Sequence, residues 1–177
     1  PFHQLEPFEG IEIMIEPKMS FGTGHHQTTH LMCASMMEMD FHSKRVLDMG
    51  SGTGVLAILA EKRGATDIVA IDIEEWSAEN CADNSLRNGC IHIQSLHGGM
   101  EVIPLEKFDV VLANINKNVL TAQISTYADR MNEGAHLLLS GFFVSDTDEL
   151  KVLAEGLNLK FIDQHEREGW AVLIFKK

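Results

Sequence analysis

Two glycine-rich runs lie close together in the first third of the chain, and both carry residues that suit ligand binding. The first, SFGTGHHQTTH, covers residues 20–30, and the second, VLDMGSGTG, covers residues 46–54. Gly50, Gly52 and Gly54 follow a short apolar segment, and glycines at such a turn let the backbone adopt positive φ and approach a ligand. Two such runs so close together indicate that both close on the same ligand.

An acidic residue follows at the place expected for a nucleotide site. Asp72 ends the next apolar segment. In nucleotide-binding folds the helix after a glycine turn offers free N–H donors to an anion, and an acid at the end of the next strand accepts the ribose hydroxyls. The glycine turn and Asp72 therefore predict an adenosine-type ligand. An ordinary tight turn is the alternative for Gly50 and Gly52, but it leaves Asp72 unexplained.

The elements that position these residues alternate between strand and helix. Apolar runs predict strands at 11–15, 45–49, 67–73, 90–96, 108–114, 135–141, 159–166 and 170–177, with the last two forming a hairpin. Helical spacing predicts helices at 28–39, 55–64, 74–89, 117–131 and 146–156. This alternation implies an α/β fold with a mainly parallel sheet and helices on both faces. The methionine stripe of the first helix favours core packing over a cofactor site.

The composition limits the classes of partner. The 177 residues suit one domain, and 45% apolar with 23% charged residues is ordinary for a globular protein. No apolar run is long enough to cross a membrane. The net charge of −12 argues against direct nucleic-acid binding and suits a basic protein partner, although acidity also simply aids solubility. Cys33, Cys81 and Cys90 show no CxxC spacing, which predicts free thiols and a cytoplasmic location.

The details of the glycine turn separate the possible nucleotide ligands. Val55 occupies the third Gly/Ala position of the nicotinamide fingerprint, and no Walker GK[ST] sequence is present. A GxGxG turn preceded by Asp48 resembles instead the nucleotide loop of S-adenosylmethionine-dependent methyltransferases. The alternative role for Asp48 is to cap backbone N–H groups and order the loop.

Longer stretches narrow this resemblance. SFGTGHHQTT, VLDMGSGTG, IDIEEWSAENCADNSLRNG, VVLANI and EGWAVL together resemble the catalytic domain of the PrmA family of ribosomal protein methyltransferases, which methylate large-subunit ribosomal protein eleven. The resemblance implies a Rossmann-like S-adenosylmethionine-dependent methyltransferase fold, with a mainly parallel seven-stranded sheet and a C-terminal antiparallel strand. It implies that residues 20–177 form this domain and that 1–19 are a linker or N-terminal extension. The family's small substrate-recognition domain is not among these residues.

The resemblance also implies the site residues. The family's opening run is close to FGTGTHPTT, from which His25 and Gln27 depart. This run would close over the methionine end of the cofactor, while the glycine loop supports its carboxylate and adenosine. The implied cofactor-binding residues are Phe21, Thr23, Gly24, Thr29, Asp48, Gly50, Gly52, Asp72 and Asn114.

Asn114 and His26 are the expected catalytic residues. Asn114 would accept a hydrogen bond from the substrate amine or hold the methionine end of the cofactor, and a turn-forming role is the alternative. The sequence NINK that begins there lacks the prolines and aromatic residue of an NPPY-like motif, which favours a flexible aliphatic amine over a flat base or amide. Lys117 departs from the family's usual sequence and is otherwise a solvated helix-start residue. His26 would form a polar wall near the reacting methyl group.

Several neighbouring residues have competing interpretations. His25, His26 and His30 do not predict a metal site, because no cysteine or carboxylate nearby completes a tetrahedral set. Thr28 or Thr29 is expected to cap the helix that follows. Phe142 and Trp170 either line a substrate channel or pack in the core.

The expected function is an S-adenosylmethionine-dependent N-methyltransferase that modifies lysine side chains, or the N-terminal amine, of a ribosomal protein. A lysine amine, with a pKa of about 10.4, must lose its proton before it attacks, and a less polar channel favours that loss. The alternatives are a methyltransferase for another basic protein or small amine, a nicotinamide-dependent oxidoreductase, and a catalytically idle cofactor-binding module. The sequence does not determine the oligomeric state or the number of methyl groups transferred.

Overall fold

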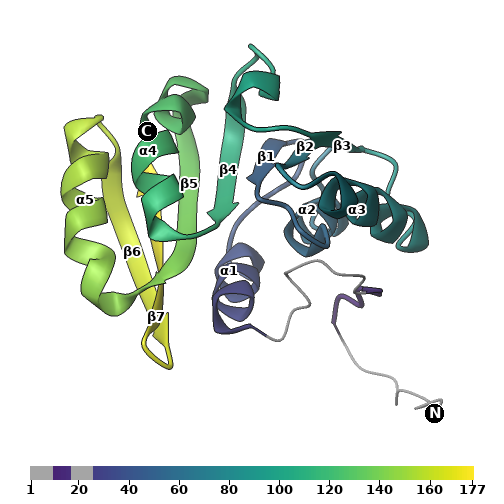
Figure 1. The fold of residues 1–177 in the computed structure, drawn as a ribbon, viewed down its shortest axis with the longest axis horizontal. Coiled ribbons are helices and arrows are strands. Elements are labelled where there is room, and N and C mark those ends of the chain that lie inside the picture. The colour runs from purple at the N-terminus through teal and green to yellow at the C-terminus, as the bar shows by residue number, and fades with distance from the viewer. Residues whose placement is uncertain (1–9, 17–25) are drawn as a thin grey trace.

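The computed structural model describes residues 10–16 and 26–177, and Figure 1 shows how their elements are arranged. The strands are β1 (Arg45–Met49), β2 (Asp67–Asp72), β3 (Ile93–His97), β4 (Phe108–Asn114), β5 (Met131–Phe143), β6 (Lys160–Arg167) and β7 (Trp170–Lys176). The helices are α1 (Gln27–Met37), α2 (Val55–Lys62), α3 (Glu75–Arg87), α4 (Lys117–Asp129) and α5 (Thr147–Gly156), with 3₁₀ turns η1 (Met100–Val102) and η2 (Val144–Asp146).

The seven strands form one sheet in the order β3-β2-β1-β4-β5-β7-β6. Strands β1 to β5 are parallel to one another, and β7 runs antiparallel between β5 and β6. Glu168 and Gly169, with φ of 51° and 81°, turn the chain between β6 and β7, as a tight hairpin requires. The predicted fold class, the mainly parallel seven-stranded sheet and the C-terminal antiparallel strand are thus confirmed.

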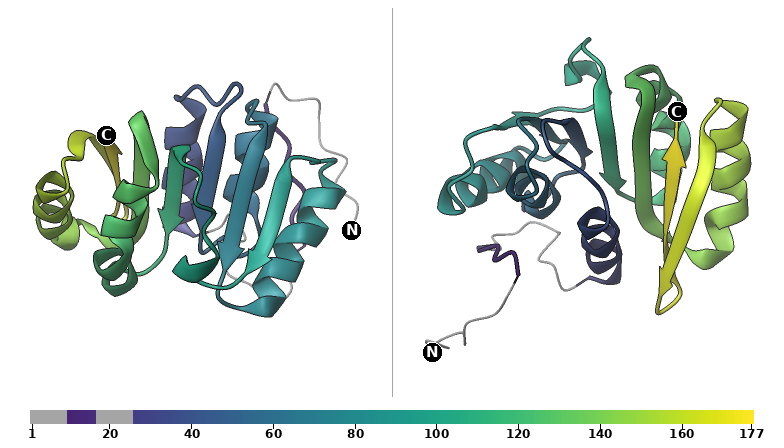
Figure 2. Two further views of the ribbon diagram at one scale, coloured as in Figure 1. Left: turned by 90° about the horizontal axis from the view of Figure 1, so that it is seen from above. Right: turned by 180° about the vertical axis from the view of Figure 1, so that it is seen from behind.

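Helices cover both faces of the sheet, and each face has its own apolar core (Figures 1 and 2). Because side chains alternate along a strand, Leu47 and Val111 point to the face covered by α4 and α5, whereas Val46 and Val110 point to the face covered by α1 and α2. The same alternation turns the side chain of Asn114 toward α1. The buried methionines of α1 pack in this second core, which confirms their predicted structural role.

Residues 11–15, predicted to be a strand, are extended but join no strand. Ile11, Ile13 and Ile15 are partly buried against the core under α1 and α2. The backbone of this segment is bound by asparagine side chains of α3 instead of by a neighbouring strand, so no sheet ladder forms. The strand prediction was wrong for that reason, although the alternation that prompted it reflects real burial.

Strand β5 is longer than predicted. The strand was predicted at 135–141, yet it begins at Met131, which lies opposite Phe108 of β4, and ends at Phe143. The ladder accommodates these residues through a register shift between Phe108 and Val110.

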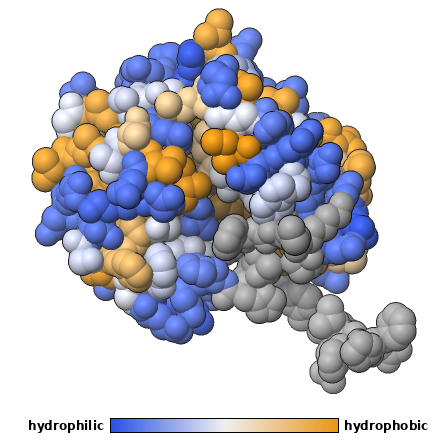
Figure 3. All heavy atoms as spheres, in the orientation of Figure 1, coloured by the Kyte–Doolittle hydropathy of each residue, from blue (hydrophilic) through white to orange (hydrophobic). Residues whose placement is uncertain are grey.

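Over the face in Figure 3, hydrophilic and apolar side chains are interspersed among the described residues. None of the helices in residues 26–177 combines the length and apolar character needed to cross a membrane.

Candidate functional site

The candidate site lies at the carboxyl ends of β1, β2 and β4. Strand β1 is the first strand of the sheet in sequence and sits between β2 and β4, so the strand order reverses beside it. In open α/β sheets ligands bind at this kind of switch point. The ends of these three strands carry the loop Gly50–Gly54, Asp72 and Asn114.

The three glycines of the loop all adopt the left-handed conformation, with φ of 72°, 53° and 80° at Gly50, Gly52 and Gly54. At Gly54, which caps the start of α2, a Cβ atom would also lie 2.6 Å from Sγ of Cys81. Both the backbone conformation and the close approach of α3 therefore require glycine here. The result is a tightly turned loop that leads directly into the N-terminus of a helix.

Asp72 holds this loop in place. Its Oδ2 accepts a hydrogen bond from the backbone N–H of Gly52 at 2.8 Å, and its Oδ1 accepts one from the N–H of Glu74 at 3.0 Å. The N–H groups of Gly50 and Ser51 both donate to the carbonyl of Ile71. Because a carboxylate has about four acceptor sites, Asp72 retains acceptor capacity on both oxygens for further donors such as vicinal hydroxyls.

Asp48 supports the loop from within the core. It is only 1% exposed, and its Oδ2 accepts a hydrogen bond from the N–H of Ala57 in α2 at 3.2 Å. Burial raises the pKa of its carboxyl group from 3.8 to about 7, and the nearby charge of Asp72 acts in the same direction. The contact matches the capping role foreseen as the alternative for this residue.

We expect Asp48→Asn to change how stability depends on pH. Because the pKa of Asp48 is higher in the folded protein than in the unfolded chain, its contribution to stability is fully present below the unfolded pKa of 3.8 and is lost as the pH rises toward 7. The variant lacks this loss. Its free energy of unfolding relative to wild type should rise by up to about 1.4 kcal/mol per pH unit between about pH 5 and about pH 6.5. Urea unfolding across this range measures the difference, and parallel profiles would contradict the assignment.

Asn114, the last residue of β4, contacts the first turn of α1. Its Nδ2 donates to Oγ1 of Thr29 at 3.4 Å, and Thr29 is only 2% exposed. This contact joins Thr29 of the first glycine-rich run to Asn114 at the end of β4. It brings the end of β4 to the start of the helix that follows the first glycine-rich run.

His26, not a threonine, is the N-cap of α1. Its Nδ1 accepts a hydrogen bond from the N–H of Thr28 at 3.3 Å and lies 2.8 Å from the Thr28 hydroxyl. Thr28 and Thr29 are inside the first helical turn, so the prediction that one of them caps the helix was wrong. The His26 ring also packs edge-on against Trp170, with centroids 4.9 Å apart. His26 and Trp170 thus pack together where the start of α1 meets the start of β7.

Phe143, which the sequence analysis overlooked, is the aromatic partner of Trp170. Their ring centroids are 4.2 Å apart and Phe143 is 51% exposed, whereas Phe142 is 2% exposed in the core under α4 and α5. Of the two interpretations of Phe142, core packing is the observed one. The sheet register shifts between Ser140 and Phe142, which reverses the faces of the two phenylalanines.

The turn after β4 is fixed by close backbone contact. The N–H of Ile115 donates to the carbonyl of Ser140 at 3.1 Å, and a Cβ atom at Gly141 would overlap the carbonyl of Ile115. Asn116 caps α4 by accepting from the N–H of Val119 at 3.2 Å. The sequence analysis did not assign a role to Ile115 or Gly141. The only sequence signal for this contact is a glycine at position 141, where the apolar pattern of the strand is interrupted.

Lys117 is ion-paired instead of simply solvated. Its Nζ lies 2.6 Å from Glu149 Oε2 and 3.1 Å from Asp146 Oδ1. Hydrogen bonds to Glu149 and then to Asp146 raise its pKa. Lys117 therefore remains a cation that ties the start of α4 to α5.

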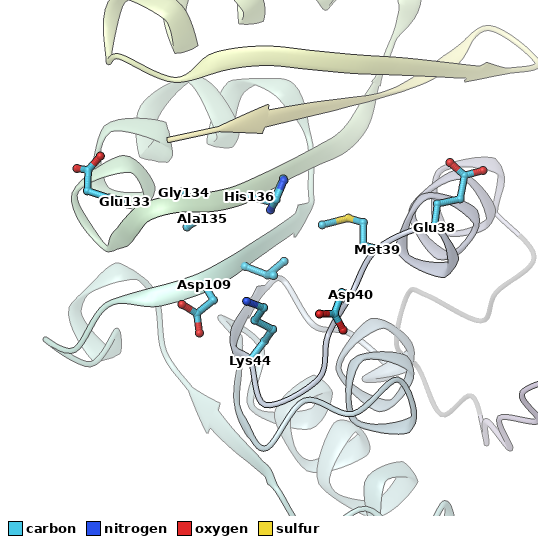
Figure 4. Close-up of a pocket in the computed structure, with 10 residues that line it drawn as sticks. Glu38, Met39, Asp40, Lys44, Asp109, Glu133, Gly134, Ala135 and His136 are labelled. Atoms are coloured by element: carbon cyan, nitrogen blue, oxygen red, sulfur yellow. The ribbon is translucent and has the colours of Figure 1, made fainter.

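A separate cavity of about 400 Å³ lies at the opposite edge of the sheet, near the amino ends of β1, β4 and β5 (Figure 4). Lys44, Asp109 and His136 are among its lining residues. Asp109 accepts from the N–H of Arg45 and from Nδ2 of Asn132, so its carboxylate supports the strands. This cavity is distinct from the loop, Asp72 and Asn114.

Three predicted cofactor-binding residues, Phe21, Thr23 and Gly24, lie outside the described residues, as does His25. Within residues 10–16 and 26–177, no group of three or more His, Cys, Asp or Glu side chains is arranged to hold a metal ion.

Comparisons with known proteins agree on one family. The family described as ribosomal protein L11 methyltransferase (PrmA) matches residues 2–177. Curated ribosomal protein L11 methyltransferases from Porphyromonas gingivalis and Phocaeicola vulgatus are 43% and 41% identical, over 99% and 98% of this chain. The chain spans 61% and 62% of the length of these two relatives.

Solved structures show the same likeness. A ribosomal protein L11 methylase from Lactobacillus delbrueckii subsp. bulgaricus matches with a TM-score of 0.89 and 26% identity, covering 98% of this chain and 90% of that one. A magnesium protoporphyrin IX methyltransferase from Synechocystis PCC 6803, solved with bound S-adenosylmethionine, has a TM-score of 0.72 and 18% identity, covering 87% and 80% of the two chains. The second likeness concerns the fold alone.

Proposed function

The chain belongs to the ribosomal protein L11 methyltransferase (PrmA) family, and on that premise we propose that it transfers methyl groups from S-adenosylmethionine to amino groups of a ribosomal protein. The acceptors are lysine side chains, or the N-terminal amine, and the relatives' names point to L11 as the substrate. The observation that carries the proposal is the hydrogen bond between Asn114 and Thr29 at the edge of the sheet that also holds the glycine loop.

The residues at this edge fit the proposed cofactor. The left-handed glycines Gly50 and Gly52 turn the loop backbone at this edge of the sheet, with the Ile115 side chain packed against Gly50, and the N-terminus of α2 offers N–H donors to a carboxylate. The remaining acceptor sites of Asp72 suit two ribose hydroxyls. We propose that Thr29, Phe21, Thr23 and Gly24 surround the methionine end, and that Asp48 acts from beneath the loop.

The bound cofactor would supply an already activated methyl group on a sulfonium, so the protein's task is to align the acceptor and exclude water. Because Nδ2 of Asn114 donates to Thr29, its Oδ1 is available to accept a hydrogen bond from an incoming amine. This contact would hold the amine in the orientation for attack. The rings of His26, Trp170 and Phe143 form an aromatic wall on the same side of the sheet.

A strong general base is not required by this arrangement. The substrate lysine must be neutral before it attacks the methyl group. An aromatic, partly desolvated channel lowers the pKa of an amine because it penalises the charged form. Lys117 is an unsuitable competitor for the methyl group, since its two carboxylate partners raise its pKa and keep it protonated.

We propose that recognition of the substrate involves residues beyond those of this chain. We propose that residues 20–177 form the catalytic domain, and that the part of the relatives' length beyond this chain contributes to recognition of L11. The net charge of −12 suits a basic protein substrate. We propose the cytoplasm as the site of action, where ribosomal proteins are found and where the free Cys33, Cys81 and Cys90 would stay reduced.

A methyl-transfer assay tests the function. The chain, S-adenosylmethionine and purified L11 are incubated, and the mass of L11 is followed for added methyl groups. We expect transfer by wild type and a loss of about 10- to 100-fold in kcat for Asn114→Ala, because a hydrogen bond to the reacting amine is removed. Asn118→Ala, an exposed asparagine on α4, is the matched control and should retain the wild-type rate.

The alternatives give different results in the same assay. Cofactor binding without transfer to L11 or to other basic proteins, even after the remaining part of a relative is joined to this chain as a recognition domain, would favour an idle cofactor-binding module. Transfer to a small amine but not to L11 would favour the small-amine alternative.

A further inference from the structure

Three asparagines spaced four residues apart, Asn80 and Asn84 in α3 and Asn88 at its C-cap, bind the backbone of residues 10–16 (Figure 1, dark purple). Oδ1 of Asn88 accepts from the N–H of Met14 at 2.9 Å and its Nδ2 donates to the carbonyl of Met14 at 2.7 Å. Oδ1 of Asn84 accepts from the N–H of Glu16 at 3.0 Å, and Nδ2 of Asn80 donates to the Glu16 carbonyl at 3.1 Å.

The spacing of these contacts has a geometric cause. Four residues of a helix advance by about 6.0 Å, and two residues of an extended chain advance by about 6.6 Å. Asparagines at positions four apart therefore come into register with alternate residues of an extended segment. Each side-chain amide offers both a donor and an acceptor, as a residue on a neighbouring strand would. The helix thus binds residues 10–16 in the way that a sheet edge binds a strand.

Asn84 differs from the other two because it also reaches the glycine loop. Its Nδ2 donates to the carbonyl of Thr53 at 3.0 Å, between Gly52 and Gly54, while its Oδ1 binds the N–H of Glu16. The side chain is 0% exposed. One buried amide therefore joins the loop proposed to hold the cofactor and the segment that continues into residues 17–25, the stretch containing most of the first glycine-rich run.

We propose that Asn84 is a positioning residue that couples the loop Gly50–Gly54 to residues 10–16, so that cofactor binding and docking of this segment strengthen each other. The inference rests on the proposed function, because it concerns the same cofactor. The coupling is reciprocal: a ligand that orders the loop must stabilise the docked segment by the same factor by which docking strengthens the ligand's binding. It also requires asparagine at position 84, because aspartate lacks the N–H donors that bind the Thr53 carbonyl.

Calorimetric titration and amide hydrogen exchange with S-adenosylhomocysteine test the coupling. In wild type we expect the ligand to slow exchange of the Glu16 N–H, since that hydrogen bond to Asn84 should open less often. In Asn84→Ala the Kd for the ligand should rise about 10-fold, and the ligand should no longer slow exchange at Glu16. Asn88→Ala, which removes contacts to the segment but none to the loop, should speed exchange at Met14 while leaving the effect of ligand at Glu16.

A second pair of variants avoids the core of the domain. Glu16→Pro removes the N–H that donates to Asn84, whereas Glu16→Ala keeps this N–H and removes only the ion pair with Arg87. Glu16→Pro should weaken binding of S-adenosylhomocysteine several-fold, and Glu16→Ala should bind like wild type. This pair decides the question even if Asn84→Ala does not fold.

The outcomes separate the two proposals. A wild type that binds no S-adenosylhomocysteine overturns the proposed function and this coupling with it. A wild type that binds the ligand without any change in Glu16 exchange, or a Glu16→Pro variant with wild-type affinity, overturns the coupling alone.

Discussion

Asp72→Ala should bind S-adenosylhomocysteine at least about 100-fold more weakly than wild type. The substitution removes the acceptors proposed for two ribose hydroxyls, and each hydrogen bond to a charged acceptor contributes about 1.5–3 kcal/mol. It also leaves the N–H of Gly52 without its carboxylate partner, which loosens the loop that must hold the ligand. Calorimetric titration of both proteins measures the change, and a parallel titration with NAD examines the nicotinamide alternative.

Two controls separate the roles of Asp72. Asp72→Asn retains an oxygen that can accept from Gly52 but has no charge and one acceptor fewer, so its affinity should fall between those of wild type and Asp72→Ala. Glu75→Ala removes an exposed acid from the first turn of α3 and should bind normally. Tight binding by Asp72→Ala, or binding of NAD by wild type, would show that the ligand was misidentified.

Gly141→Ala should lower the free energy of unfolding by about 2–4 kcal/mol, as overpacking at a buried backbone contact does. A Cβ atom at this position would overlap the carbonyl group of Ile115, and backbone cannot move aside as a flexible side chain can. The φ of 98° adds strain for any L side chain. Urea unfolding monitored by circular dichroism gives the value.

Gly169→Ala is the matched control for the strain. Its φ of 81° is also left-handed, but a Cβ atom there would meet nothing within 4 Å. We expect a loss of about 1–2 kcal/mol from backbone conformation alone. If the two variants lose equal stability, the contact with Ile115 is not what requires glycine at position 141. If Gly141→Ala also loses methyl transfer beyond its loss of folded protein, the contact positions Asn114 as well.

The sequence predicts the elements well because each strand and helix has a local pattern. Strands β1 and β4 begin and end where their apolar runs do, since polar residues bound both. The parallel order and the closing hairpin follow from alternation of elements and from Glu168-Gly169. Regular alternation fails at the register shift beside Gly141, which exchanges the faces of Phe142 and Phe143, whereas residues 11–15 alternate regularly but pair with α3 side chains instead of a strand.

The site is predicted in its parts but not in its connections. Asp72 and the glycine loop carry a spacing that indicates a nucleotide, whereas the neighbourhood of Asn114 and Thr29 came from the family resemblance and not from any local pattern. The spacing of Asn80, Asn84 and Asn88 is visible in the sequence, but nothing in it shows that the partner is the backbone 64 to 74 residues earlier. A backbone group that binds a distant side chain can belong to any residue type, so the sequence carries no pattern that marks it.

The position of β7 has a consequence for how the domain is made. This strand is the last of the seven to be synthesised, yet it lies between β5 and β6. While the chain emerges from the ribosome, β6 therefore has no strand beside which to settle, and the edge of β5 stays open. Assembly from the N-terminal side can complete the order β3-β2-β1-β4-β5 early, but sheet closure must wait for residues 170–176.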